Sequence, residues 1–193
     1  MLPKLASIGV LLLAWAMADS RPMSSMSSSM IEALRAEGPH ASLGAQASVF
    51  GRLVGTWDLT CERHASDGAH TNSRGIWSFG WVIDGRILQD VIDFFAAGQS
   101  AERDGGTTLR FYDTQTRQWR VYFFAPARNA VIALAGGAEG NRIVLRGNDV
   151  DGSLLRWSFN DIKPDSLYWK GEISHDGGKS WRIEQEMHLT RHR

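Results

Sequence analysis

The chain has 193 residues, long enough for one domain with a substantial core. Lysine plus arginine and aspartate plus glutamate both number 21, so the charge balance predicts neither nucleic-acid binding nor attachment to an acidic membrane surface. The one cysteine, Cys61, excludes a disulfide within the chain and a cysteine-cluster zinc site. Twenty glycines, five prolines and eight tryptophans are typical of short strands joined by tight turns.

Residues 1–18 differ from the rest of the chain. Lys4 precedes an apolar run that ends in Ala16-Met17-Ala18, a small-x-small pattern suited to cleavage before Asp19. The run is too short and too rich in alanine and glycine for a membrane anchor. It therefore predicts a secretory signal peptide on a periplasmic or secreted protein with no stable membrane insertion.

An alternative is a cytoplasmic protein whose start has been assigned too early. Met23, Met26 and Met30 are other starts, and the domain needs nothing upstream of them. Residues 19–29, with many serines, are interpreted as a linker in either case.

Residues 30–48 predict a short N-terminal helical segment. Ser29 is a suitable N-cap, Glu32 occupies the third helical position, and Gly38 ends the helix. A second helical turn is expected over residues 45–53, and helical periodicity ends there.

Residues 49–193 predict a single β-barrel domain. From Gly55 onward the apolar pattern has a period of two, and short segments rich in Gly, Asp and Asn punctuate it. The pattern predicts strands over residues 55–63, 72–83, 86–95, 107–113, 118–125, 130–136, 142–148, 154–162, 166–174 and 179–190.

These connections are too short for the crossovers that parallel strands require, so the sheet should be an antiparallel meander. Closing ten such strands on themselves removes both exposed edges. The fold class predicted is all-β: a ten-stranded antiparallel up-and-down β-barrel with a short helical segment before it.

The two side-chain parities predict an inner and an outer face. Aromatic rings bury large apolar areas, so the aromatic parity should face inward. Residues expected inside are Trp77, Phe79, Trp81, Leu109, Phe111, Trp119, Val121, Phe123, Trp157, Phe159, Trp169, Trp181, Ile183 and Met187. Residues expected outside are Arg110, Arg120, Arg156, Lys170, Glu172, Arg182, Glu184, Glu186 and His188.

The last hairpin has a predicted register. If Ser174 pairs with Ser180, Glu172 falls opposite Arg182, and further opposite charges meet along the same two strands. A shift of one residue loses this match.

Gly55-Thr56-Trp57, placed after a helical turn and at the start of the first strand, resembles the G-x-W signature of the calycin superfamily. That superfamily includes lipocalins, fatty-acid-binding proteins and nitrobindin-like haem barrels. In lipocalins an arginine from the end of the barrel packs over the tryptophan. The resemblance implies this role for Arg191, with Arg182 as second choice.

The longer pattern resembles a bacterial lipocalin-like family of unknown function, over about residues 49–190. The stretches that carry it include "GTWDL", "WSFGWVIDGRILQDV", "GTTLRFYD", "RWSFNDI" and "DSLYWKGEISHDGGKSW". The resemblance implies a barrel whose interior binds a small hydrophobic molecule. It does not identify the ligand.

Residues 174–181, "SHDGGKSW", match the Asp-box hairpin of sialidase propellers. In that hairpin the aspartate accepts backbone N–H groups within the turn and the tryptophan packs its base, so the motif is structural. The motif occurs once here, without the repeat period of a propeller. We interpret it as the turn of the last hairpin, with Trp181 in the core.

Asp90 is the polar residue expected on the aromatic face, because the Asp84-Gly85 turn pairs Phe79 with Asp90. A buried carboxylate is costly unless it is paired. Two interpretations remain open: a rim residue bonded to Arg86 or to water, or a polar anchor of the cavity. If the barrel is an isomerase- or cyclase-type enzyme, Asp90 is its expected general acid or base.

The six histidines form no recognised zinc motif, and neither a metal site nor a cofactor is expected. His64 and His70 flank the Asp67-Gly68 turn and should be exposed. The resemblance to nitrobindin-like barrels makes His188 the positional analogue of a haem ligand, although its parity predicts that it faces outward.

The sequence therefore predicts a barrel that binds a small hydrophobic ligand, and it favours a binding protein over an enzyme. A structural or partner-binding module with a filled interior is a further alternative. The residues expected to bind the ligand are Trp77, Phe79, Trp81, Asp90, Phe111, Trp119, Phe123, Trp157 and Trp169.

Overall fold

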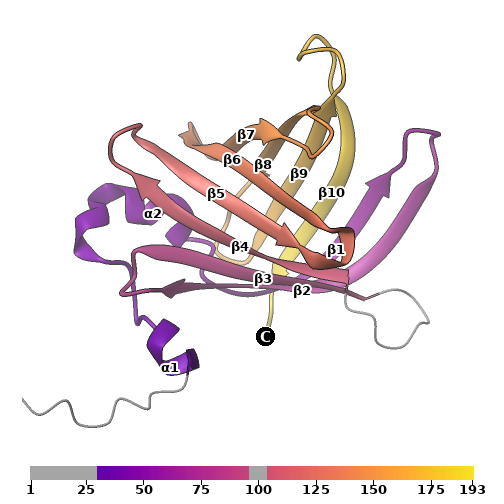
Figure 1. Ribbon diagram of the computed structural model, residues 1–193. Coiled ribbons are helices and arrows are strands. Elements are labelled where there is room, and N and C mark those ends of the chain that lie inside the picture. The colour runs from indigo at the N-terminus through magenta and orange to yellow at the C-terminus, as the bar shows by residue number, and fades with distance from the viewer. Residues whose placement is uncertain (1–29, 96–103) are drawn as a thin grey trace, which may run out of the picture.

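The computed structural model describes residues 30–95 and 104–193, and its strands form a closed antiparallel barrel in the order β1-β10-β9-β8-β7-β6-β5-β4-β3-β2 (Figure 1). The predicted fold class is confirmed. The predicted signal peptide and linker lie outside the described residues. The strands are β1 (Gly55–His64), β2 (His70–Val82), β3 (Ile87–Phe95), β4 (Asp104–Asp113), β5 (Gln118–Ala125), β6 (Ala130–Glu139), β7 (Arg142–Asn148), β8 (Leu154–Asn160), β9 (Ser166–Ser174) and β10 (Arg182–Arg191).

Short helices precede the barrel, and α2 blocks one of its ends (Figure 1). They are α1 (Met30–Leu34), η1 (Ala41–Gln46) and α2 (Ala47–Gly51), and one further turn, η2 (Pro126–Arg128), joins β5 to β6. Phe50 of α2 and Leu53 after it are completely buried in the core. Within the described residues, no helix has both the length and the apolar character to cross a membrane.

The turn between β2 and β3 receives the N-terminal segment. The Ile83 N–H donates to Leu34 O at 3.1 Å, and the His40 N–H donates to Gly85 O at 3.0 Å. Gly85 has a φ of 71°, and a Cβ there would lie 2.1 Å from Gly38 O, so glycine is required at this contact. The turn pairs Phe79 with Asp90, as predicted.

Arg191 of β10 closes the barrel against β1. Its guanidinium carbon lies 3.6 Å from the ring centroid of Trp57. The guanidinium also donates hydrogen bonds to Val54 O at 2.7 Å and to Pro164 O at 3.2 Å. The Trp57 indole N–H donates to Leu53 O at 2.8 Å. The predicted stacking of Arg191 on this tryptophan is confirmed. The contacts join β1 and β10, the first and last strands, to the segment that blocks the barrel.

The predicted facing of β4 is wrong. Thr108 lies opposite Asp90 of β3 and Arg110 lies on the same inner face, where both are buried. Phe111, expected inside, is 39% exposed and stacks on Tyr122 with ring centroids 6.3 Å apart. Both parities of β4 carry apolar and polar residues, so alternation could not determine the face. A buried carboxylate such as that of Asp90 needs a cation beside it, which favours the observed facing of β4, with Arg110 inside.

The predicted register of the last hairpin is also wrong. Ile183, not Arg182, lies opposite Glu172. A bulge between Ile183 and Gln185 then adds one more residue to β10, so that Glu186, not Glu184, lies opposite Lys170. Because side chains alternate along a strand, an extra residue reverses which face the β10 side chains before the bulge point to. Glu184, expected outside, therefore reaches the barrel interior.

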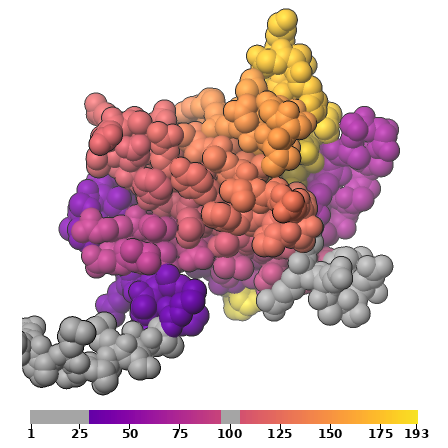
Figure 2. Space-filling view, in the orientation of Figure 1, coloured from indigo at the N-terminus to yellow at the C-terminus, as the bar shows by residue number. Residues whose placement is uncertain are grey.

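The Asp-box segment forms the turn between β9 and β10, which projects beyond the body of the barrel (Figure 2). Asp176 accepts hydrogen bonds from the hydroxyl and N–H of Ser180 at 2.6 and 2.9 Å, and from the Ser174 hydroxyl at 2.8 Å. These bonds hold the pKa of Asp176 well below its ordinary value. Trp181 was expected in the core, and this prediction is wrong. It packs under the Arg156 guanidinium, whose carbon lies 4.2 Å from its ring centroid.

We predict that Arg191→Ala lowers the free energy of unfolding by about 2 kcal/mol, because it removes a stacked cation and its hydrogen bonds to two segments of the chain. Urea unfolding followed by tryptophan fluorescence measures this. Arg193→Ala, at an exposed position on the same terminus, is the control and should change stability by less than about 0.5 kcal/mol. Equal losses in the two variants would contradict the role assigned to Arg191.

Candidate functional site

A cavity of about 540 Å³ lies inside the barrel and reaches the end opposite α2. Residues of the β1–β2, β5–β6 and β7–β8 turns line that end. Near α2 the interior is packed, since Phe50 lies edge-on to Trp119 with ring centroids 5.1 Å apart and to Phe159 at 6.1 Å. The barrel is thus filled in one half and hollow in the other. Most of the cavity wall is apolar: Trp77, Ile92, Phe94, Phe123, Ile132, Leu155, Trp157, Phe159, Trp169 and Met187.

The predicted ligand-binding residues divide into three groups. Four of them line the cavity, from strands on both sides of the barrel: Trp77, Phe123, Trp157 and Trp169. Four others are buried but do not line it: Phe79, Trp81, Asp90 and Trp119. Phe111 is on the outer surface, so its assignment to the cavity is wrong.

Four aromatic residues of the wall, the four predicted from the sequence, pack against one another. The indoles of Trp157 and Trp169 lie edge to face with centroids 5.6 Å apart, and Trp169 meets Trp77 at 6.3 Å. Phe123 lies edge-on to Trp157 at 5.6 Å. T-shaped contacts hold each ring in place and leave other ring faces turned to the cavity. The wall is therefore a preformed aromatic surface.

Among the described residues, three buried N–H groups that belong to the cavity lining have no hydrogen-bond partner: Trp77 Nε1, Trp169 Nε1 and Arg110 Nε. Most buried polar atoms in proteins are paired, so such groups call for an explanation. All three are donors. A molecule in the cavity that carries a hydrogen-bond acceptor would satisfy at least one of them.

Asp90 and Arg110 form a buried ion pair between Asp90 Oδ2 and Arg110 Nη1, with side chains 0% and 3% exposed. The Thr108 hydroxyl donates to Asp90 Oδ1 at 3.0 Å. The guanidinium carbon of Arg110 lies 5.4 and 5.5 Å from the ring centroids of Phe50 and Phe79. Arg110 lines the cavity and Asp90 does not, so Asp90 neutralises and orients the arginine that forms part of the cavity floor.

Neither open interpretation of Asp90 describes this arrangement. Arg86, the expected rim partner, instead contacts the His40 ring at 2.8 Å. Reasoning from sequence missed Arg110, yet the signal was present. Asp90 was placed on the inner face, and Arg110 is the single basic residue in residues 104–113 opposite it.

Charges of both signs surround the outer end of the cavity. Arg63, Arg128, Asp149 and Glu184 line it there. Burial, and next the charge of Asp149, raise the pKa of Glu184. Reasoning from alternation missed Glu184 because no sequence signal marked the bulge that turns it inward.

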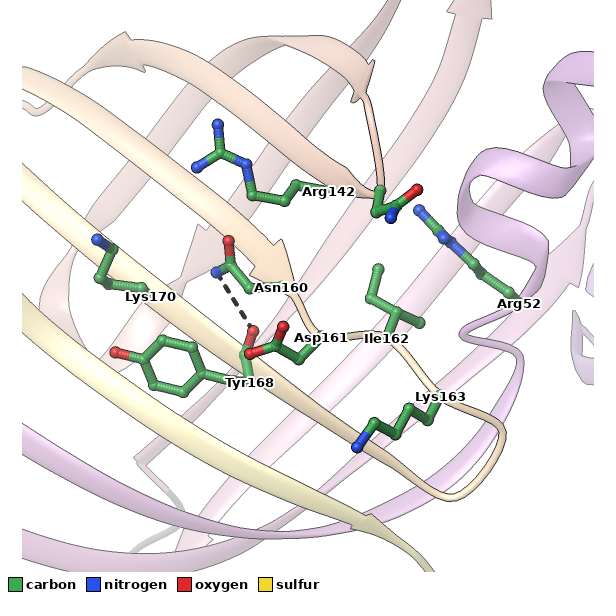
Figure 3. A pocket seen from close by; sticks show the side chains of 9 residues that line it. Arg52, Arg142, Asn160, Asp161, Ile162, Lys163, Tyr168 and Lys170 are labelled. Atoms are coloured by element: carbon green, nitrogen blue, oxygen red, sulfur yellow. Dashed lines mark hydrogen bonds between the residues drawn. The ribbon is translucent and has the colours of Figure 1, made fainter.

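A second hollow, of about 570 Å³, lies outside the barrel beside α2, the β6–β7 turn and the β8–β9 connection (Figure 3). Its lining is polar and mainly basic: Arg52, Asn141, Arg142, Asn160, Asp161, Ile162, Lys163, Tyr168 and Lys170. Its one aliphatic side chain is Ile162. An apolar ligand would gain little there, so the cavity inside the barrel is the candidate site.

The histidines are placed partly as expected. His188 is exposed on the outer face, with its ring 5.0 Å from that of Tyr168, so it cannot reach the cavity as a haem ligand. His64 and His70 were expected to be exposed, and His70 is, whereas His64 is partly buried. The β1–β2 pairing instead sets them opposite each other, and both lie close to Glu62.

The fold and the cavity define a calycin-like barrel: ten antiparallel strands closed on themselves, one blocked end, one hollow half, and an arginine stacked on the first-strand tryptophan. The chain is similar to the crystal structure of Rv2717c from M. tuberculosis, with a TM-score of 0.59 and 15% identity over 80% of this chain and 99% of that chain. It is also similar to the S-type phycobiliprotein lyase CPES from Guillardia theta, with a TM-score of 0.55 and 14% identity over 75% of this chain and 90% of that chain. No protein-family model and no curated protein matches the chain. At these identities the likeness establishes the fold alone.

We predict that Asp90→Asn destabilises the protein by about 3–5 kcal/mol, because it leaves Arg110 buried without a counter-charge. The double variant Asp90→Leu/Arg110→Met should be more stable than Asp90→Asn, since it removes both buried charges together. Chemical denaturation of the three proteins measures the difference. A double variant that is the least stable of them would contradict this interpretation of the pair.

Proposed function

We propose that the protein binds a small, largely apolar molecule inside the barrel, with aromatic or other flat apolar surface and at least one hydrogen-bond acceptor. The observation that carries this is the hollow half of the barrel, lined by an aromatic wall and by three N–H groups without partners. A volume of about 540 Å³ is within the range of small-molecule sites in proteins.

The apolar part of the ligand follows from the wall. Covering the ring surface that Trp77, Trp157 and Trp169 turn to the cavity would remove apolar surface from water, which is worth about 25 cal/mol per Å². The rings already hold one another in place, so little side-chain freedom is lost when a ligand binds.

The acceptor follows from the unpaired donors. A carbonyl, ether or carboxylate oxygen near Trp77, Trp169 or Arg110 would pair an N–H that is otherwise buried without a partner. Because Asp90 neutralises Arg110, the floor does not demand an anion, so a neutral carbonyl compound suits the site as well as an acid.

The structural relatives are consistent with this proposal. One of them is a phycobiliprotein lyase, so a barrel of this shape can serve an enzyme, and binding followed by chemistry is the second candidate function. The cavity offers Glu184, a lining carboxyl whose pKa burial raises, as the general acid or base in place of the predicted Asp90. The binding function is preferred because the described lining is mainly aromatic and aliphatic, with buried N–H donors among the rings.

We predict that filling the cavity abolishes binding. Ile132 lines the cavity, whereas its neighbour Val131 is 56% exposed on the outer face. Ile132→Trp should block uptake of an apolar fluorophore, pyrenebutyric acid, and Val131→Trp should not. Fluorescence titration measures both variants, with circular dichroism to confirm that each is folded. Equal uptake by both would show that the dye binds elsewhere.

We predict that the unpaired indole N–H groups recognise the acceptor. Trp77→Phe and Trp169→Phe should each weaken the binding of pyrenebutyric acid by about tenfold. The binding of butylpyrene, which has no hydrogen-bond acceptor, should stay nearly unchanged. Trp119→Phe is the control, because its N–H is equally buried and unpaired but does not line the cavity. Parallel losses for both dyes would mean that the indoles act by shape alone.

A further inference from the structure

Two histidines and a glutamate converge at the end of the β1–β2 hairpin. His64 and His70 face each other across the two strands, with ring centroids 4.7 Å apart. Glu62 Oε1 lies 2.8 Å from His70 Nδ1 and 4.0 Å from His64 Nδ1. One donor atom from each of the three residues lies within 4.8 Å of the other two.

These separations suit three ligands of one metal ion. Metal–ligand bonds of about 2.0–2.2 Å in a tetrahedral arrangement place neighbouring ligand atoms about 3.4 Å apart. The two distances from Glu62 bracket that value. His70 and Glu62 are about half exposed, so small rotations of their side chains can close the difference.

A second carboxylate fixes the orientation of His64. Its Nε2 lies 3.0 Å from Glu186 Oε2, on the side of the ring away from Glu62. Glu186 also accepts a hydrogen bond from the Tyr168 hydroxyl, which fixes the position of its carboxylate. When this carboxylate accepts the Nε2 proton of His64, the Nδ1 lone pair is left toward Glu62. Metal-binding histidines typically have such a carboxylate behind them.

We infer that Glu62, His64 and His70 form a binding site for a divalent transition-metal cation of the Zn²⁺ type, with Glu186 as the residue that orients His64. Two imidazoles and one carboxylate are a ligand set for zinc and its neighbours and a poor one for Ca²⁺ or Mg²⁺. Three protein ligands leave a position open to water. His64 also lines the cavity, with Ala65 and Ala69, so the site lies at the cavity rim.

The chain supplies a control for an ordinary histidine–carboxylate pair. His192 Nδ1 lies 2.9 Å from Asp58 Oδ1 at the other end of β1. That pair has the same two groups at nearly the same distance as His70 and Glu62. Among the described residues, no third histidine, cysteine or carboxylate donor joins this pair.

The test is isothermal titration of Zn²⁺ into the full chain without a polyhistidine tag. We expect one saturable site that His70→Ala and Glu62→Gln each weaken by at least about tenfold, and that His192→Ala leaves unchanged. Glu186→Gln should weaken it by about 10–100-fold without removing a ligand. Circular dichroism confirms that each variant is folded.

Co²⁺ in place of Zn²⁺ gives a second readout, because visible absorption bands report its coordination. The wild-type bands should be lost in His70→Ala and kept in His192→Ala. Three results would overturn the inference: no saturable Zn²⁺ binding, equal affinity in wild type and the His70 and Glu62 variants, or an equal loss in His192→Ala. None of these outcomes depends on whether the cavity binds a ligand.

Discussion

The stacking of Arg191 on Trp57 is the contact on which the rest of the barrel depends. It joins the last strand to the first, where the sheet must close, and its hydrogen bonds reach the segment before β1 and the β8–β9 connection. Closure leaves no edge strand. The same contacts hold Phe50 and Leu53 in one end of the barrel, so they also determine which end is blocked and which half can stay hollow.

The buried pair of Asp90 and Arg110 separates the packed half from the hollow half. Each charge alone would be too costly at that depth, and together they put a neutral but polar floor beneath an aromatic wall. The unpaired N–H donors of the cavity lining favour a ligand that carries a hydrogen-bond acceptor. The second hollow, shown in Figure 3, lies outside the barrel, and its lining is polar and rich in basic residues rather than aromatic.

Local patterns predicted most of the fold. Turn residues and alternation located all ten strands, and the short β2–β3 turn determined the pairing of Phe79 with Asp90, because few registers fit so short a connection. Alternation failed in β4, where both parities carry rings and polar groups, and in β10, where a bulge adds one residue. Of the candidate site, the sequence indicated Trp77, Phe123, Trp157 and Trp169, and missed Arg110, Glu184 and the histidine cluster.

The sequence by itself determined the barrel, its strand order and the aromatic supply of its interior, because turn chemistry and period-two alternation are local properties of the chain. Only the tertiary structure decided where that interior stays empty. A cavity depends on how side chains from every strand, together with Phe50 of α2, fill a common volume. The partner of Asp90 and the convergence of Glu62, His64, His70 and Glu186 likewise depend on cross-strand register. Away from the short β2–β3 turn, strand register follows from closure and bulges across the whole sheet rather than from a local stretch of sequence.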